Sequence, residues 1–268
     1  MQMTPAARIA AMLGVLALVV TVTSCSHRTT DKAASTTATS PASTATTSLA
    51  PVAPVTGPAL PPFIPSPGVG ADCRYPPSTD PAGKPAGTPQ TGKVATDPAG
   101  IGLTIVTDRG RIGLQLANNE SPCTVNSFVN LAQKAYFDNT ECHRLTTAHA
   151  LSVLQCGDPK GDGTGGPGYQ FADEYPTDQY PPGDPALKQP VVYPRGTLAM
   201  ANAGPGTNGS QFFMVYRDSL LPPAYTVFGK INAAGLTVLD KIASAGVSGG
   251  GEDGPPATEV TITSARRD

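Results

Sequence analysis

The 268-residue chain has few charged residues and no tryptophan. Eighteen lysines and arginines against twenty aspartates and glutamates give a net charge of −2, and charged residues make up only 14% of the chain. There is no basic block, so the sequence offers no source for the phosphate neutralisation on which nucleic-acid binding depends. We therefore expect no nucleic-acid partner.

The sequence also lacks an apolar run long enough for a transmembrane helix. The run of apolar, Ala, Gly and Thr residues from Ile9 to Val22 has fourteen residues, whereas a helix needs about 20 to cross the hydrocarbon core. A short run that follows a stretch containing Arg8 is typical of a signal peptide. We place this signal peptide at residues 1–24 and expect the protein to be exported.

The segment Val22-Thr23-Ser24-Cys25 ends this run and resembles the bacterial lipobox, in which small residues precede a cysteine that becomes lipidated. We therefore expect Cys25 to carry the lipid, palmitate included. More than one acyl chain gives stable attachment, which places the protein on the extracytoplasmic face of the cell membrane. The alternative is ordinary cleavage near Ser24 with an unmodified Cys25.

Proline and glycine are abundant, with 29 of each. All but three residues between Ala33 and Thr56 are Ser, Thr, Ala or Pro, and proline-rich sequence continues to Pro89. Such a composition buries too little apolar surface to offset chain entropy. We therefore expect a disordered tether over residues 25–94 and one folded domain over residues 95–268.

Short apolar segments in this domain predict a mainly β fold. The segments 101–106 and 111–116 flank a turn and predict a hairpin. Ser121-Pro122 predicts an N-cap and a first-turn proline of a helix, and a second helix is expected over 236–243. Further strands are expected at 141–145, 151–156, 196–201, 212–216, 226–231 and 259–263. Many short strands and two helices favour a closed or nearly closed antiparallel barrel.

Two sequence blocks resemble the cyclophilin-type peptidyl-prolyl cis-trans isomerases. The first is Cys142-His143-Arg144-Leu145 with Val153-Leu154-Gln155-Cys156-Gly157-Asp158, and the second runs from Met200 to Phe213. Thr226-Val227-Phe228-Gly229 adds to the likeness, which covers 101–262. The resemblance implies a closed eight-stranded antiparallel barrel capped by two helices.

The resemblance also implies a substrate, a reaction and no cofactor or metal. The substrate is a polypeptide with an X-Pro bond, whose rotation faces a barrier near 20 kcal/mol. The transition state is a twisted amide in which the proline nitrogen regains its lone pair. A charged donor aimed at that nitrogen stabilises the twisted amide more than the planar one, without a covalent intermediate.

By motif position, Arg144 is this donor, Gln155 braces it, and Asn202 binds the residue before proline through its main chain. The positions that match the family's substrate groove and proline pocket are Phe213, Gln211, Leu221, Val153, Ala201 and Tyr225.

Three departures from the family pattern concern the pocket. The interval between Arg144 and Gln155 is longer, which leaves open whether Leu151 or Ser152 replaces the usual phenylalanine. The family's Trp-Leu pair is Leu220-Leu221 here, so we expect weak cyclosporin binding. Tyr225 stands at the pocket histidine position.

Four cysteines besides Cys25 allow three pairings. Adjacent antiparallel strands would bring Cys142 near Cys156, which leaves Cys73 to join Cys123. Export favours disulfides, and free buried thiols are the alternative. A zinc site formed by the Cys142–Cys156 pair with His143 and His149 is disfavoured, because neighbours on a strand point to opposite faces.

Two functions remain. The favoured one is a monomeric, lipid-anchored prolyl isomerase that acts on X-Pro bonds of exported proteins. The alternative is a non-catalytic peptide-binding or adhesive cell-surface protein on the same fold.

Overall fold

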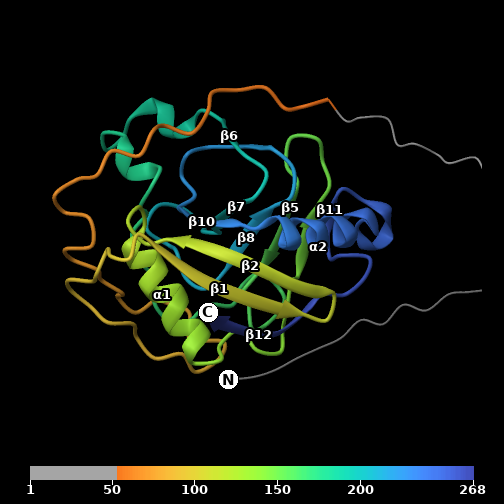
Figure 1. Cartoon of the computed structure of the whole chain (residues 1–268), viewed down its shortest axis with the longest axis horizontal. Coiled ribbons are helices and arrows are strands. Elements are labelled where there is room, and N and C mark those ends of the chain that lie inside the picture. Colours follow the sequence, from red (N-terminus) through yellow and green to blue (C-terminus); the bar gives the residue numbers. More distant parts are fainter. Residues whose placement is uncertain (1–52) are drawn as a thin grey trace, which may run out of the picture. The chain divides into compact units, whose positions relative to one another are not determined.

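The computed structural model describes residues 53–268, and these belong to one compact unit (Figure 1). The expected signal peptide, the expected lipid site at Cys25 and the first part of the expected tether lie outside the described residues. Within 53–268, no helix has the length and apolarity needed to cross a membrane.

The main sheet is antiparallel throughout and has the strand order β11-β4-β5-β8-β7-β10-β2-β1-β12-β3. Its strands are β1 (Gly100–Thr107), β2 (Gly110–Ala117), β3 (Thr140–Glu141), β4 (Arg144–Thr146), β5 (Val153–Cys156), β7 (Thr197–Met200), β8 (Phe212–Val215), β10 (Val227–Ile231), β11 (Asp253–Gly254) and β12 (Thr261–Arg267). A separate two-stranded sheet joins β6 (Val191–Tyr193) to β9 (Ser219–Leu221).

The sheet is a curled half-barrel, and the expected closed barrel of eight strands is wrong. β3 and β4 lie near opposite ends of the strand order, although only Cys142 and His143 separate them along the chain. The sheet must therefore curl until its two ends approach each other. The expected single strand at 141–145 is divided because its two halves pair with different partners, β12 for β3 and β5 for β4.

The hairpin and both helices are confirmed. β1 and β2 form the expected hairpin, and the helices are α1 (Pro122–Gln133) and α2 (Ala233–Ser244). Single-turn 3-10 helices occur at Thr177–Gln179, Pro185–Lys188 and Ser248–Gly250. The sequence did not predict β6, β9 or β11, which have two or three residues each and lack a local pattern.

The cap of α1 differs from the expected one. Ser121 is the N-cap residue but makes no side-chain cap, because its hydroxyl donates to the carbonyl of Val227. The carboxylate of Glu174 instead accepts hydrogen bonds from the amides of Cys123 and Thr124, at 3.0 and 2.7 Å, and from the Thr124 hydroxyl. A distant acid therefore satisfies the helix N-terminus.

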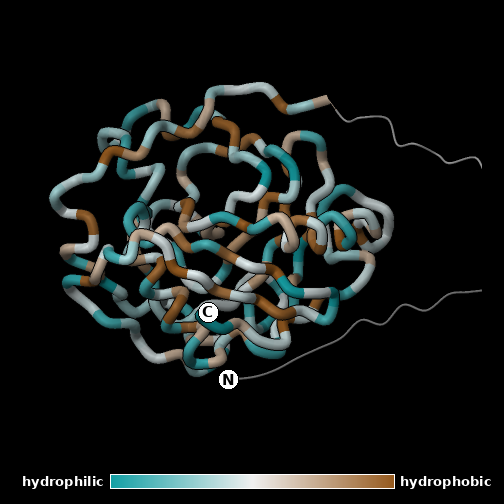
Figure 2. Tube along the Cα trace, in the orientation of Figure 1, coloured by the Kyte–Doolittle hydropathy of each residue, from teal (hydrophilic) through white to brown (hydrophobic). Residues whose placement is uncertain are grey.

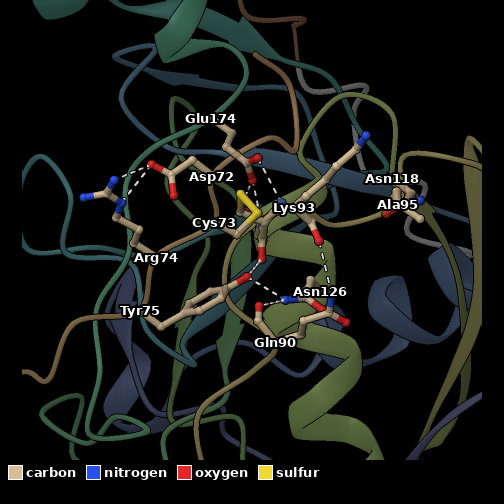
Figure 3. Close-up of a disulfide and its surroundings, with 12 residues drawn as sticks. Asp72, Cys73, Arg74, Tyr75, Gln90, Lys93, Ala95, Asn118, Asn126 and Glu174 are labelled. Carbon is tan, nitrogen blue, oxygen red and sulfur yellow. Dashed lines mark hydrogen bonds and ion pairs between the residues drawn. A yellow bond between two sulfur atoms is a disulfide. The ribbon is translucent and has the colours of Figure 1, made fainter. Parts of the chain in front are cut away.

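The described part of the expected tether, residues 53–94, is not an unfolded chain, and the predicted domain boundary at residue 95 is wrong. Cys73 is disulfide-bonded to Cys123 of α1. Figure 3 shows Tyr75 beside this bond, where its hydroxyl donates to the Cys123 carbonyl and accepts from Asn126. Tyr75, Ala86 and Val94 are buried in the main core. A few apolar anchors and one covalent bond thus order a sequence whose average composition predicts disorder.

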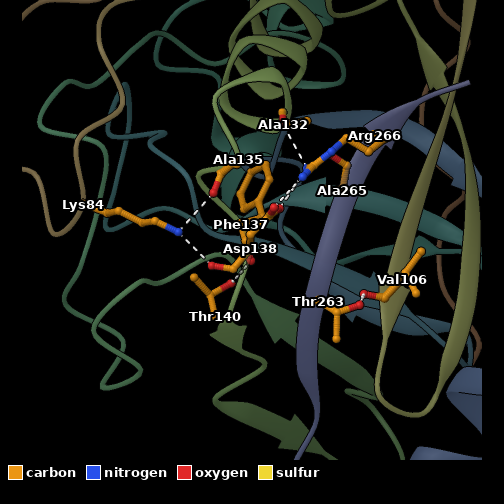
Figure 4. A network of polar contacts seen from close by, with 10 residues as sticks. All are labelled: Lys84, Val106, Ala132, Ala135, Phe137, Asp138, Thr140, Thr263, Ala265 and Arg266. Atoms are coloured by element: carbon orange, nitrogen blue, oxygen red, sulfur yellow. Dashed lines mark hydrogen bonds and ion pairs between the residues drawn. The ribbon is translucent and has the colours of Figure 1, made fainter.

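Two further contacts hold this segment on the domain. The Lys84 ammonium donates to the carbonyls of Ala135 and Asp138 after α1 (Figure 4). Farther toward the N-terminus, Leu60 and Phe63 pack against a second apolar cluster, which includes Phe213 and Tyr193. Ala59 forms an isolated β-bridge with Val192 of β6. Figure 1 shows this stretch in orange passing β6, and Figure 2 shows its isolated hydrophobic residues among more polar ones.

Alternation along the strands divides the core into two clusters. On β5, Leu154 belongs to the main cluster beneath the helices, while Val153 belongs to the second cluster. On β8, Met214 belongs to the main cluster and Phe213 to the second. Neighbouring residues of a strand point to opposite faces, so the second cluster lies on the other face of the sheet from the main core.

Candidate functional site

Strand register places three of the expected site residues in one row across the sheet. Arg144 of β4 is opposite Gln155 of β5, and Gln155 is opposite Phe213 of β8. Directly opposed residues point to the same face. The row therefore lies on the face of the second apolar cluster, and it runs from a cation through an amide to an aromatic ring.

Arg144 is held from two sides. Its Nε and Nη2 donate to the two carboxylate oxygens of Asp253 on β11, both at 2.7 Å, and its Nη1 donates to Oε1 of Gln155 at 3.1 Å. The bidentate pair raises the pKa of Arg144 and lowers the pKa of Asp253, so both are charged at neutral pH. A guanidinium has five N–H donors, and two therefore remain for a substrate.

Gln155 and Gln211 continue this polar chain. Nε2 of Gln155 donates to Oε1 of Gln211 at 2.9 Å, and Nε2 of Gln211 donates to the carbonyls of Gly163 and Gly165. The glycine-rich loop at 161–166 thus fixes Gln211, Gln211 fixes Gln155, and Gln155 fixes Arg144. Each amide is oriented by its neighbour, which preorganises the arginine.

Part of the second apolar cluster adjoins this polar chain. Phe213 and Val153 are buried in the second cluster, and Leu221, Ala201 and Tyr225 are partly buried against it. The rings of Phe213 and Tyr225 meet edge to face with centroids 5.8 Å apart. All five residues were expected in the substrate groove or the proline pocket, and the fold brings them together.

The interval between Arg144 and Gln155 is longer than in the family, and it places Leu151, rather than Ser152, at the second apolar cluster. Leu151 is partly buried against the second cluster. Ser152 is fully buried, its amide donates to the Ser219 hydroxyl, and its own hydroxyl donates to the Ala148 carbonyl. Ser152 therefore anchors the strand, and Leu151 is available to contact a ligand.

Asn202 follows Ala201 at the edge of the second apolar cluster, and its side chain holds the surrounding main chain in place. Its Nδ2 donates to the Ala224 carbonyl at 2.8 Å, and its Oδ1 accepts from the Gly204 amide. The preceding amide, that of Ala201, donates to the Gln211 carbonyl. The side chain thus fixes the main chain that was expected to bind the residue before proline.

The four cysteines form the disulfides Cys73–Cys123 and Cys142–Cys156, which is the expected pairing. Sulfurs bonded to each other cannot serve as thiolate ligands, so the zinc alternative fails. The Cys142–Cys156 disulfide joins a residue just before Arg144 to the residue that follows Gln155. It ties together the two strands that carry the polar chain.

Sequence reasoning missed one residue of the polar chain. Asp253 lies 109 residues from Arg144, in a stretch where Gly and acidic residues predict only a loop. No local signal identifies it, because its role depends on β11 pairing with β4.

Comparisons with known proteins identify the family of this chain. A family model described as "Cyclophilin type peptidyl-prolyl cis-trans isomerase/CLD" matches residues 102–267. The chain is 72% identical over 213 residues to a probable peptidyl-prolyl cis-trans isomerase B of Mycobacterium tuberculosis, covering 80% of this chain and 69% of the relative. It is 67% identical over 209 residues to the probable isomerase B of Mycobacterium leprae, covering 78% and 71%.

A crystal structure gives the same result for the fold. A cyclophilin type peptidyl-prolyl cis-trans isomerase of Cryptosporidium parvum matches with a TM-score of 0.50 and 29% identity, covering 63% of this chain and 98% of that chain. Since the family match spans more than half of the sequence and the fold agrees, this protein belongs to the cyclophilin-type peptidyl-prolyl cis-trans isomerases and is an enzyme.

Proposed function

We propose that the enzyme accelerates X-Pro rotation by packing the proline ring against the second apolar cluster at Phe213 and aiming Arg144 at the proline nitrogen of the twisted amide. The observation that carries this proposal is the chain Asp253–Arg144–Gln155 beside Phe213. Apolar side chains next to a fixed cation suit a proline ring whose amide loses resonance.

The charge of Arg144 suits this step for two reasons. The proline nitrogen is a poor acceptor in the planar amide and a good one in the twisted amide, so the interaction favours the transition state over the ground state. The guanidinium is already oriented by Asp253 and Gln155 before substrate arrives, so little reorganisation accompanies the reaction. No bond is broken, and the two free donors of Arg144 suffice.

The variant Arg144→Ala tests this role. A charge-assisted hydrogen bond contributes about 1.5–3 kcal/mol, so we expect kcat/KM for an X-Pro peptide to fall by about 10- to 150-fold. Circular dichroism and thermal unfolding should show an intact fold. Arg111→Ala, which removes an exposed arginine of β2, is the matched control and should retain the wild-type rate. An unchanged rate for Arg144→Ala removes Arg144 from the mechanism, and peptide binding without acceleration by the wild type favours the non-catalytic alternative.

We further propose that the protein works outside the cytoplasmic membrane, anchored by a lipid on Cys25, and acts on exported polypeptides. Two disulfides among the described residues support this location, because disulfides persist in oxidising compartments. Mass spectrometry of the mature N-terminus should find acylated Cys25, and Cys25→Ser should release the full-length protein from the membrane fraction. An unmodified cysteine contradicts the anchor and leaves the isomerase proposal standing.

The same proposal includes weak cyclosporin binding by a monomer. Tyr225 stands at the family's histidine position and Leu220-Leu221 stands at its Trp-Leu pair, so an indole donor is missing.

A further inference from the structure

A recess with a volume of about 320 Å³ adjoins the polar chain, and Gln155 and Gln211 line it whereas Arg144 does not. Gln155, Gln211, Ala201 and Asn202 form the wall that it shares with the catalytic groove, and the loop residues Gly163–Gly166 form another wall. A substrate bound across Gln155 and Asn202 thus has this recess within reach.

The third wall comes from the N-terminal segment that was expected to be a tether. Ser78 and Asp80 line the recess. Both lie outside the range matched by the family, residues 102–267. The recess is therefore completed by a part of the chain that the catalytic domain of the family does not include.

Backbone hydrogen bonds fix this third wall. The Ser78 amide donates to the Gly168 carbonyl at 3.1 Å, and the Gly83 amide donates to the Gly166 carbonyl at 2.9 Å. The Ser78 hydroxyl donates to the Asp80 carbonyl at 2.5 Å. Residues 78–83 therefore run beside 166–168 in a defined position, with Asp80 between the two anchor points.

Asp80 is the one charged residue that lines this recess. Its carboxylate forms no hydrogen bond or ion pair among residues 53–268, and the residue is exposed to solvent. The other lining residues are neutral, and many of them, such as Gln155, Thr164 and Thr207, are polar. The recess thus presents an uncompensated negative charge at its outer wall.

We infer that Asp80 selects substrates with a lysine or arginine side chain on the amino-terminal side of the X-Pro bond. This inference rests on the proposed function and on the expectation that the main chain at Asn202 holds the residue before proline. Ala201 and Asn202 line the recess, whereas Phe213 and Tyr225 do not, so the recess receives a side chain from a part of the peptide other than the proline ring. A long cationic side chain reaches the Asp80 carboxylate, whereas an acidic one is repelled.

The experiment compares kcat/KM for three X-Pro peptides that differ at the residue before X, which is Lys, Gln or Glu. For the wild-type chain we expect Lys to exceed Gln by about two- to fivefold, the size of a single exposed charge interaction, and Glu to fall below Gln. Asp80→Asn should abolish the differences in kcat/KM among the three peptides, and Asp80→Lys should reverse their order. Glu259→Gln, an exposed acid outside the recess, is the matched control and should keep the wild-type order.

Ionic strength provides a second readout. Raising salt from about 0.01 to 1 M shortens the Debye length from about 30 to 3 Å, so the Lys preference should shrink toward one. Equal kcat/KM for all three peptides at low salt, or a Lys preference that survives Asp80→Asn, overturns the inference. If no peptide is isomerised, the proposed function fails instead, and equilibrium binding of the same three peptides still decides the role of Asp80.

Discussion

Arg144 has two partners, and only one of them lies near it in the sequence. Gln155 is 11 residues away, whereas Asp253 is 109 residues away and holds the guanidinium through two of its nitrogens. The Arg144 and Asp253 side chains keep 38% and 56% of their exposure, so the pair contributes no more than about 1 kcal/mol to stability. We expect Asp253 to act mainly by orienting the Arg144 guanidinium.

We therefore expect Asp253→Asn to lower kcat/KM for an X-Pro peptide by about three- to tenfold, or about 0.7–1.4 kcal/mol, because the freed guanidinium samples other rotamers. The matched control is Asp240→Asn, which breaks the equally exposed bidentate pair of Arg195 with Asp240 on α2. Both variants should unfold at similar urea concentrations, and only Asp253→Asn should lose activity. Equal activity of the two variants contradicts an orienting role for Asp253.

At the scale of elements, α1 depends on a residue from outside the helix. Glu174 caps its N-terminus and is partly buried, and desolvation raises its pKa from 4.5 to about 7 against the lowering effect of its hydrogen bonds. Between these two pH values the folded protein holds a proton that the unfolded chain has released. Stability contributed by this group is therefore greatest below about pH 4.5 and falls as the pH rises to about 7.

This linkage predicts a pH-dependent free energy of unfolding. In the wild type, urea denaturation should show a loss of up to about 3 kcal/mol from Glu174 between pH 4.5 and 7. Glu174→Gln cannot ionise, so its stability curve should lack that loss, while Glu259→Gln should keep the wild-type slope. Parallel curves for Glu174→Gln and the wild type would falsify the burial-driven shift.

At the scale of the whole molecule, the N-terminal segment is part of the folded unit. The Cys73–Cys123 disulfide closes a 50-residue separation, and Cys73 and Gly92 exchange two backbone hydrogen bonds of 2.8 Å. Constraining a loop of this length stabilises the folded state by about 4 kcal/mol on entropic grounds, and removing such bonds typically costs about 2–5 kcal/mol. The disulfide thus offsets the low apolar content of the segment.

Amide hydrogen exchange tests this description. In the wild type we expect slow exchange at the amides of Cys73, Gly92 and Val94, which donate within the segment. The double variant Cys73→Ala, Cys123→Ala should exchange at these amides at least tenfold faster, while Leu114 in β2 stays protected as an internal reference. Rapid exchange at all three amides in the wild type would show that this segment is an unfolded tether after all.

Elements whose signals are local could be predicted from the sequence. The hairpin of β1 and β2, the two helices, and the identity and spacing of Arg144, Gln155 and the block from Met200 to Phe213 are all encoded within short stretches. Alternation, helix periodicity and turn residues act over a few positions, which is why these predictions succeeded.

The tertiary structure alone decided which distant residues meet. It brought Asp253 to Arg144, Glu174 to α1 and Asp80 to the recess beside Gln155, and it folded residues 53–94 onto the domain. Average composition misjudged that segment, because a few anchors such as Tyr75 and Cys73 outweigh many solvated prolines and serines. Local propensity does not specify the path of the chain between distant positions, and the curl of the sheet follows from the pairing of strands far apart in sequence.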